Sequence, residues 1–127
     1  MSELVAAMPF AAGLGLSIDV ATPEEVRGGV EFRDDLCTAG GVMHGGALMA
    51  AADSLGAVCA FLNLPEGAST ATSGSSTTFF RPVRAGRVTG VSRPVHVGRR
   101  AIVVQTELAD AEGRAVALVV QTQAVLT

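Results

Sequence analysis

The pattern of apolar and polar residues along the chain predicts one long helix between groups of short strands. Residues 45–62 carry a single charged side chain, Asp53, and the stop signals Asn63 and Pro65 follow them. A helix over Gly45 to Leu62 is therefore expected. It is apolar on all sides, which is typical of a buried central helix. A carboxylate in such a helix is costly unless it is paired, neutralised or used in chemistry.

The residues before this helix predict a short N-terminal helix and two strands. Ser2 is a candidate cap for a helix that Pro9 would end. Two strands are expected over Gly15 to Val20 and Val26 to Arg33, with a turn rich in polar residues between them. A loop from Asp34 to Val42 then leads into the long helix.

The residues after the helix predict strands only. Gly74 is a candidate β-bulge, Pro94 indicates an edge position or a kink, and residues 110–113 predict a hairpin turn. The order of elements predicts an α+β fold with an antiparallel sheet on one central helix, and the 127 residues are expected to form a single domain. The four expected strands are Ser69 to Phe80, Arg87 to Val97, Arg100 to Leu108 and Arg114 to Leu126.

Composition narrows the class of function. Hydrophobic residues make up 49% of the chain and charged residues 17%, with a mean hydropathy of +0.44, so some apolar surface is expected to be buried in a homo-oligomer. The net charge is −3 and the basic residues form no block, which argues against nucleic-acid binding. The chain has no Trp or Tyr on which bases could stack.

The apolar run from Val42 to Leu62 is close to the length of a membrane span, but its composition argues against one. It is rich in Ala and Gly, and Asp53 at the bilayer centre would cost about 2.5–3.5 kcal/mol. The two cysteines, Cys37 and Cys59, form no disulfide framework, and Glu3 lies where a signal peptide would carry a basic residue. We therefore expect a cytoplasmic protein that spans no membrane.

The candidate chemistry lies at the start and in the middle of the long helix. The Gly45 N–H and the Asp53 carboxylate are about 12 Å apart along the helix axis, and His44 points away from Asp53. One chain therefore cannot bring an oxyanion donor and a base or nucleophile to the same carbonyl. Two antiparallel helices related by a twofold axis could do so, which predicts a site at a dimer interface.

The same residues resemble the hotdog-fold acyl-CoA thioesterases, in particular the PaaI-like branch, named after phenylacetic acid degradation. The resemblance rests on His44-Gly45-Gly46 followed by Asp53 at the spacing of that family. Phe79-Phe80-Arg81-Pro82 followed by Gly86 also matches, and the similarity covers roughly residues 13–126. It implies a hotdog fold, in which an antiparallel sheet wraps around a long central helix.

The resemblance also implies catalytic roles. The Gly45 N–H would polarise the thioester carbonyl, and Asp53 of the other subunit would attack the carbonyl or activate water; both routes stay open. His44 would shape the loop or contact the substrate, and Thr72 lies where the family often has a Ser or Thr that orients the water. The acid is Asp rather than Glu, which points to the PaaI-like branch.

Further residues are implied to bind the substrate. Arg81, Arg99 and Arg100 are candidates for the phosphates of coenzyme A, because guanidinium groups suit phosphate geometry. Gly46 belongs to the implied binding loop. Thr38 replaces the Asn or Gln that the family often has six residues before the histidine, and its side chain reaches less far.

The predicted function is hydrolysis of an aryl- or fatty-acyl-CoA by a homodimer, or a dimer of dimers, without cofactor or metal. Two alternatives stay open. A hotdog hydratase–dehydratase would need a histidine and an acid placed together, and a non-catalytic module would bind acyl-CoA only. Structural interpretations also stay open: Asp53 could be a buried acid held by backbone N–H groups or a Ser, and Arg99 and Arg100 could be solvated turn charges.

Overall fold

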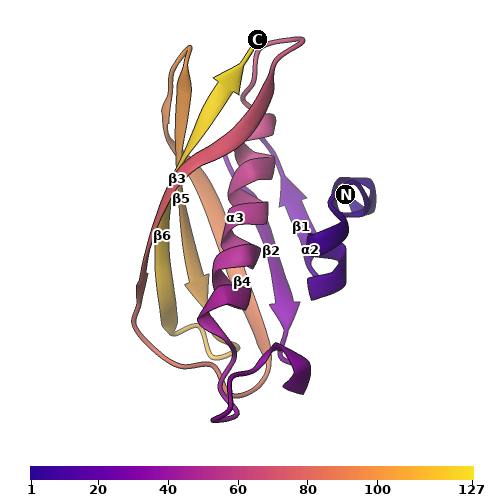
Figure 1. Cartoon of the computed structure of the whole chain (residues 1–127), viewed down its shortest axis with the longest axis vertical. Coiled ribbons are helices and arrows are strands. Elements are labelled where there is room, and N and C mark those ends of the chain that lie inside the picture. Colours follow the sequence, from indigo (N-terminus) through magenta and orange to yellow (C-terminus); the bar gives the residue numbers. More distant parts are fainter.

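An antiparallel six-stranded sheet wraps around one long helix, α3 (Gly45–Phe61), in the computed structural model, which describes residues 1–127 (Figure 1). The strands lie in the order β1-β2-β4-β5-β6-β3. This confirms the predicted α+β architecture. No helix is both long enough and apolar enough to cross a bilayer. The strands are β1 (Ser17–Ala21), β2 (Val26–Glu31), β3 (Ser69–Phe79), β4 (Arg87–Val97), β5 (Ala101–Ala109) and β6 (Ala115–Leu126).

The N-terminal region differs from the prediction. Two helices, α1 (Ser2–Ala6) and α2 (Pro9–Leu14), replace the single expected helix, and Met1 rather than Ser2 is the N-cap of α1. Pro9 begins α2 because a proline is well suited to the first helical turn, where its missing N–H is not needed. Gly15 then ends α2 with a left-handed φ of 79°, which delays the first strand to Ser17.

The remaining elements lie close to their predicted positions. The register of β3 shifts between Thr72 and Gly74, which confirms the predicted bulge. The strand β4 pairs with β2 only as far as Ser92, and its register against β5 shifts between Pro94 and His96. Pro94 therefore lies where β4 has lost one neighbour and is kinked against the other, so its missing N–H breaks no bond to β2.

The core lies between α3 and the inner face of the sheet. Leu55 on α3 is fully buried and faces two strands at once. A Cβ atom at Gly28 would lie 2.9 Å from one Leu55 methyl group, and a Cβ at Gly90 would lie 2.6 Å from the other. Glycine at both positions therefore lets the helix approach the sheet closely.

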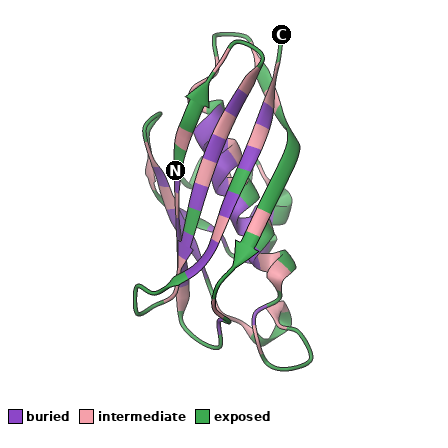
Figure 2. Cartoon of the chain, turned by 90° about the vertical axis from the view of Figure 1, so that its left-hand side faces the viewer, coloured by how far each residue is buried: buried purple, intermediate pink, exposed green.

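One side of α3 is uncovered in the single chain, which differs from the prediction of a helix buried all around. Gly46, Met49, Asp53 and Phe61 are exposed on this helix. The neighbouring edge strand β3 is exposed over most of its length, as Figure 2 shows. The prediction was wrong because one sheet and two short helices cannot surround a helix on every side.

We predict that Leu55→Ala lowers the free energy of unfolding by about 2–5 kcal/mol, because a fully buried leucine is replaced by a cavity. Urea denaturation followed by circular dichroism measures this change. Leu126→Ala removes the same atoms from a leucine that is 48% exposed and is the matched control, with an expected loss below about 1 kcal/mol. Equal losses in the two variants would contradict the central role of Leu55.

Candidate functional site

The first turn of α3 leaves one backbone N–H without a partner. The helix is capped by His44, whose Nδ1 accepts the Gly46 N–H at 2.8 Å. The N–H groups of Ala47 and Leu48 donate to the His44 carbonyl oxygen at 2.9 and 3.2 Å. The Gly45 N–H makes no hydrogen bond within the chain. It is therefore free to donate to a ligand at the positive end of the helix dipole.

The cap also defines what His44 and Gly46 can do. An Nδ1 that accepts a hydrogen bond carries no proton, so His44 can donate only through Nε2. The Gly46 N–H is used by the cap rather than presented to a ligand. In the single chain His44 therefore acts as the cap of α3.

Gly45 lines a mostly apolar cleft of about 440 Å³. The cleft brings three predicted site residues together, Thr38, Gly45 and Arg81. The Phe79 ring lies across the helix start, since a Cβ atom at Gly45 would be 3.1 Å from its Cζ. Asp53 does not line the cleft, in agreement with the helix geometry. The other lining residues are Val42, Met43, Leu48, Phe79, Phe80 and Pro82.

Asp53 lies on the uncovered side of α3 and is held by side chains of the sheet. Its Oδ1 accepts hydrogen bonds from Thr72 Oγ1 at 2.8 Å and from Gln121 Nε2 at 3.0 Å. Gln123 Nε2 in turn donates to Thr72 Oγ1 at 2.7 Å. In the single chain Asp53 is exposed, and its hydrogen-bond partners are Thr72 and Gln121 rather than backbone N–H groups or a serine, so it is not a buried acid within one chain.

Sequence reasoning missed Gln121 and Gln123. Both are at most 1% exposed and lie on the inner face of β6, where the alternation of the strand predicts apolar residues. Two glutamines two positions apart on a core-facing strand are a signal that could have been used, because buried amides need partners. Their partner could not be identified from the sequence, since Asp53 is 68 residues before Gln121.

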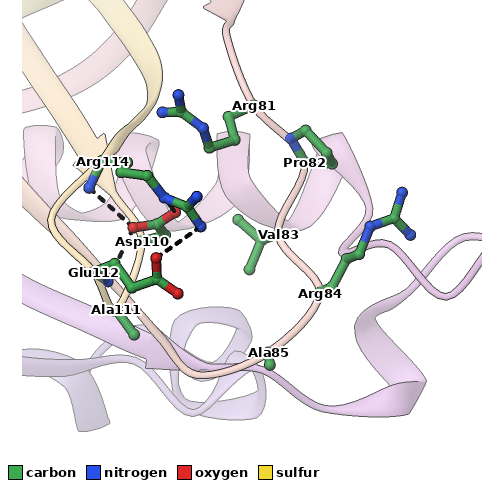
Figure 3. A pocket seen from close by; sticks show the side chains of 9 residues that line it. All are labelled: Arg81, Pro82, Val83, Arg84, Ala85, Asp110, Ala111, Glu112 and Arg114. Atoms are coloured by element: carbon green, nitrogen blue, oxygen red, sulfur yellow. Dashed lines mark hydrogen bonds and ion pairs between the residues drawn. The ribbon is translucent and has the colours of Figure 1, made fainter.

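A second hollow, of about 340 Å³, adjoins the cleft and shares Arg81 and Pro82 with it (Figure 3). Its charged groups partly neutralise each other, because Arg114 pairs with Asp110 at 2.9 Å and with Glu112 at 3.2 Å. Hydrogen bonds from the Arg114 backbone and side chain hold the pKa of Asp110 below its usual value. Arg84, which the sequence analysis did not single out, makes no ion pair here.

The other two candidate arginines lie elsewhere in the chain. Arg99 and Arg100 form the turn between β4 and β5, at the end of the sheet where β3 begins and β6 ends. Gly45 contacts the opposite end, where β3 finishes at Phe79. The structure therefore brings Arg81 to the cleft, whereas the β4–β5 turn that holds Arg99 and Arg100 lies at the other end of the sheet. Figure 1 shows this turn at the opposite end of the molecule from the start of α3.

Neither cysteine is set up as a nucleophile. Burial raises the pKa of the Cys59 thiol to about 11, and this residue of α3 is fully buried. The pKa of Cys37 is also raised, mainly by burial and to a smaller extent by the negative charges of Asp34 and Asp35. Both thiols are therefore protonated near neutral pH.

Comparison with known proteins identifies the family. The sequence profile of the thioesterase superfamily matches residues 40–117. The Mycobacterium tuberculosis protein Rv1847, which bears the provisional name of an esterase, is 33% identical over 113 residues, covering 87% of this chain and 81% of that protein. Its solved structure has a TM-score of 0.91 and 32% identity, with 94% of this chain and 97% of that chain covered.

Two further comparisons agree. The proofreading thioesterase EntH of Klebsiella pneumoniae is 36% identical over 74 residues, which are 58% of this chain and 54% of that protein. The structure of PaaI from the Escherichia coli phenylacetic acid degradation operon has a TM-score of 0.89 over 99% of this chain and 90% of that one; at 20% identity it shows the shared hotdog fold alone. The chain belongs to the thioesterase superfamily and is a thioester hydrolase of the hotdog fold.

Proposed function

We propose that this protein is an acyl-CoA thioesterase that hydrolyses aryl- or fatty-acyl-CoA to the free acid and coenzyme A, in a site shared by the two subunits of a homodimer. The observation that carries the proposal is the free Gly45 N–H at the start of α3, inside an apolar cleft. A thioester carbonyl oxygen can accept this N–H, and the helix dipole favours the negative charge that develops there. Two such dimers would pair to form a tetramer.

Asp53 supplies the second half of the reaction from the other subunit. Its Oδ1 is occupied by Thr72 and Gln121, whereas Oδ2 accepts no hydrogen bond within the chain. This free oxygen either attacks the thioester carbon or takes a proton from water that does so. It cannot reach the carbonyl held by Gly45 of its own chain, about 12 Å away along the helix.

The uncovered side of the molecule supports a second copy of the chain as the missing half. Asp53 and Met49 are exposed on α3 beside an edge strand that has a neighbour on one side only. Two copies related by a twofold axis would place their α3 helices antiparallel and cover both features. Gly45 of each subunit would then lie opposite Asp53 of the other.

The cations around the cleft support coenzyme A as the thiol portion of the substrate. Arg81 lines the cleft and the adjoining hollow, and Arg84 adds a positive charge without an ion pair. Guanidinium groups bind phosphates well. In an antiparallel dimer, Arg99 and Arg100 of one subunit come toward the Arg81 end of the other, so they are proposed to bind the nucleotide phosphates.

The contacts of Asp53 favour hydrolysis over hydration. A hydratase–dehydratase would need a histidine beside the acid, but within one chain the side chains that contact Asp53 by hydrogen bonds are Thr72 and Gln121. His44 is engaged in capping the helix through Nδ1. A panel assay of free-thiol release, run beside an enoyl-CoA hydration assay, separates the two activities and also detects a module that binds acyl-CoA without hydrolysing it.

We predict that Asp53→Asn lowers kcat for acyl-CoA hydrolysis at least about a hundredfold, because the group that attacks or takes a proton is lost. Release of free coenzyme A measures the rate, and circular dichroism checks that the fold is intact. Glu107→Gln removes one carboxylate from an exposed position away from the cleft and is the charge control. Near-normal turnover by Asp53→Asn would refute the proposed mechanism.

A second prediction isolates the Gly45 N–H. Proline is favoured at the first helical position and lacks the N–H, and His44 already has the extended conformation that precedes proline. Gly45→Pro should therefore fold normally and lower kcat about a hundredfold, as expected for loss of one oxyanion donor. Gly45→Ala adds the same Cβ, 3.1 Å from Phe79 Cζ, but keeps the N–H, so it is the matched control and should be clearly more active than Gly45→Pro. Equal activities of the two variants would rule out this donor.

A third prediction tests the sharing of the site. Gly45→Pro and Asp53→Asn chains are unfolded together, refolded and assayed as a mixture. Random pairing makes half of the dimers mixed, with one intact site in each, so about a quarter of the wild-type activity should return. A site built within one chain predicts no recovery. Sedimentation of the same samples confirms that dimers have formed.

A further inference from the structure

We propose that Gln121 is a positioning residue for catalysis: it fixes the carboxylate of Asp53 through Oδ1 and leaves Oδ2 as the only reactive oxygen. The proposal deepens the proposed function and rests on it. Gln121 is 1% exposed, and its Nε2 donates to Asp53 Oδ1 at 3.0 Å and to the Asp53 carbonyl oxygen at 3.4 Å. One amide group therefore holds both the backbone and the side chain of the acid.

The neighbouring hydrogen bonds have a defined direction. Gln123 Nε2 donates to Thr72 Oγ1 at 2.7 Å, while Gln123 Oε1, at 3.2 Å, shares the Thr70 hydroxyl proton with the Ala124 carbonyl oxygen at 2.8 Å. A threonine hydroxyl has one proton, and the Thr72 proton goes to Asp53 Oδ1 at 2.8 Å. The Asp53 Oδ1 thus accepts two hydrogen bonds from side chains of the sheet, Thr72 and Gln121. Together these two bonds restrict rotation of the carboxylate group.

This arrangement carries a cost that a purely structural residue would avoid. The Gln121 Oε1 is buried and has no hydrogen-bond partner. A Cβ atom at Gly56 would lie 1.9 Å from the same oxygen, so the glutamine also requires a glycine inside the helix. A buried acceptor without a donor and a mid-helix glycine both destabilise a protein. We infer that Gln121 is present for the donors it directs at Asp53.

A buried polar pair elsewhere on the inner face of the sheet provides the contrast. Ser92 and Thr106 are both fully buried, and their hydroxyl groups form a hydrogen bond of 2.6 Å. Each hydroxyl oxygen has a partner in this bond, and neither residue has a hydrogen bond to Asp53. This pair therefore has the properties of a structural contact, whereas Gln121 leaves an atom unsatisfied and points its donors at the acid.

The experiment replaces Gln121 by methionine, which has a similar shape but no donor. Gln121→Met should lower kcat about tenfold to a hundredfold, as expected for an acid misplaced by a fraction of an ångström, while KM changes little and Tm stays equal or rises. Gly56→Ala is an independent variant, since its methyl group pushes the Gln121 amide aside while improving helix propensity. It should show the same loss of kcat without a loss of Tm.

Thr106→Val is the matched control: it should lower Tm, because Ser92 loses its partner, and leave kcat unchanged. A Gln121→Met variant that keeps wild-type kcat and has a lower Tm would overturn the proposal. If Gln121→Met does not fold, a wild-type kcat in Gly56→Ala would overturn it instead. The wild-type and Asp53→Asn enzymes are assayed in parallel. Hydrolysis that depends on Asp53 but not on Gln121 refutes the positioning role alone.

If wild type hydrolyses no acyl-CoA, the proposed function fails, and crystal structures of the variants then test the positioning role. A displaced Asp53 carboxylate in Gln121→Met supports it. An unmoved carboxylate, still bonded to Thr72, refutes it.

Discussion

The close approach of α3 to the sheet is the constraint on which both the core and the site depend. Glycines on the sheet and on the helix make this approach possible. The Leu55 side chain of the helix packs against Gly28 and Gly90 of the sheet, and the Gln121 side chain of the sheet packs against Gly56 of the helix. A larger residue at any of these positions would collide with its partner or force it to move. Because the helix lies so close, an amide on β6 can reach the backbone and the carboxylate of Asp53. The packing that stabilises the fold therefore also sets the position of the acid.

The same helix sets the position of the proposed oxyanion donor. At the start of α3, His44 accepts hydrogen bonds from the N–H groups of the residues that follow Gly45, whereas the Gly45 N–H itself has no partner. A backbone donor on a capped helix keeps its direction without a side chain that would have to be ordered, so little reorganisation is needed when charge develops on the substrate. Because both residues belong to the same helix, Gly45 and Asp53 stay apart. In the proposed dimer, the two groups of one subunit would belong to different half-sites.

Local signals explain what the sequence could predict. The bulge before Gly74 and the turn at residues 110–113 depend on neighbouring residues only, and they were predicted correctly. The bounds of α3 depend on local signals too and were predicted to within one residue. The separation of Gly45 from Asp53 was also predictable, because helix geometry is fixed. Contacts that depend on the tertiary fold were not. Gln121 reaches Asp53 only because β6 and α3 pack together, and the uncovered stripe on α3 depends on how far the sheet wraps around it.

The composition of the uncovered surface is consistent with a second α3 helix lying against it. Ala50 and Ala57 flank Asp53 on this side of the helix, and Gly46 lies one turn further toward its start. Side chains this small allow two helices to approach closely, and a twofold axis brings each such stripe onto an identical one. The adjacent strand β3 is rich in Ser and Thr, which suits an edge strand that must remain soluble before assembly. In the proposed dimer, the surface that leaves Asp53 exposed in one chain would be covered by the second chain, and the substrate would lie between the two.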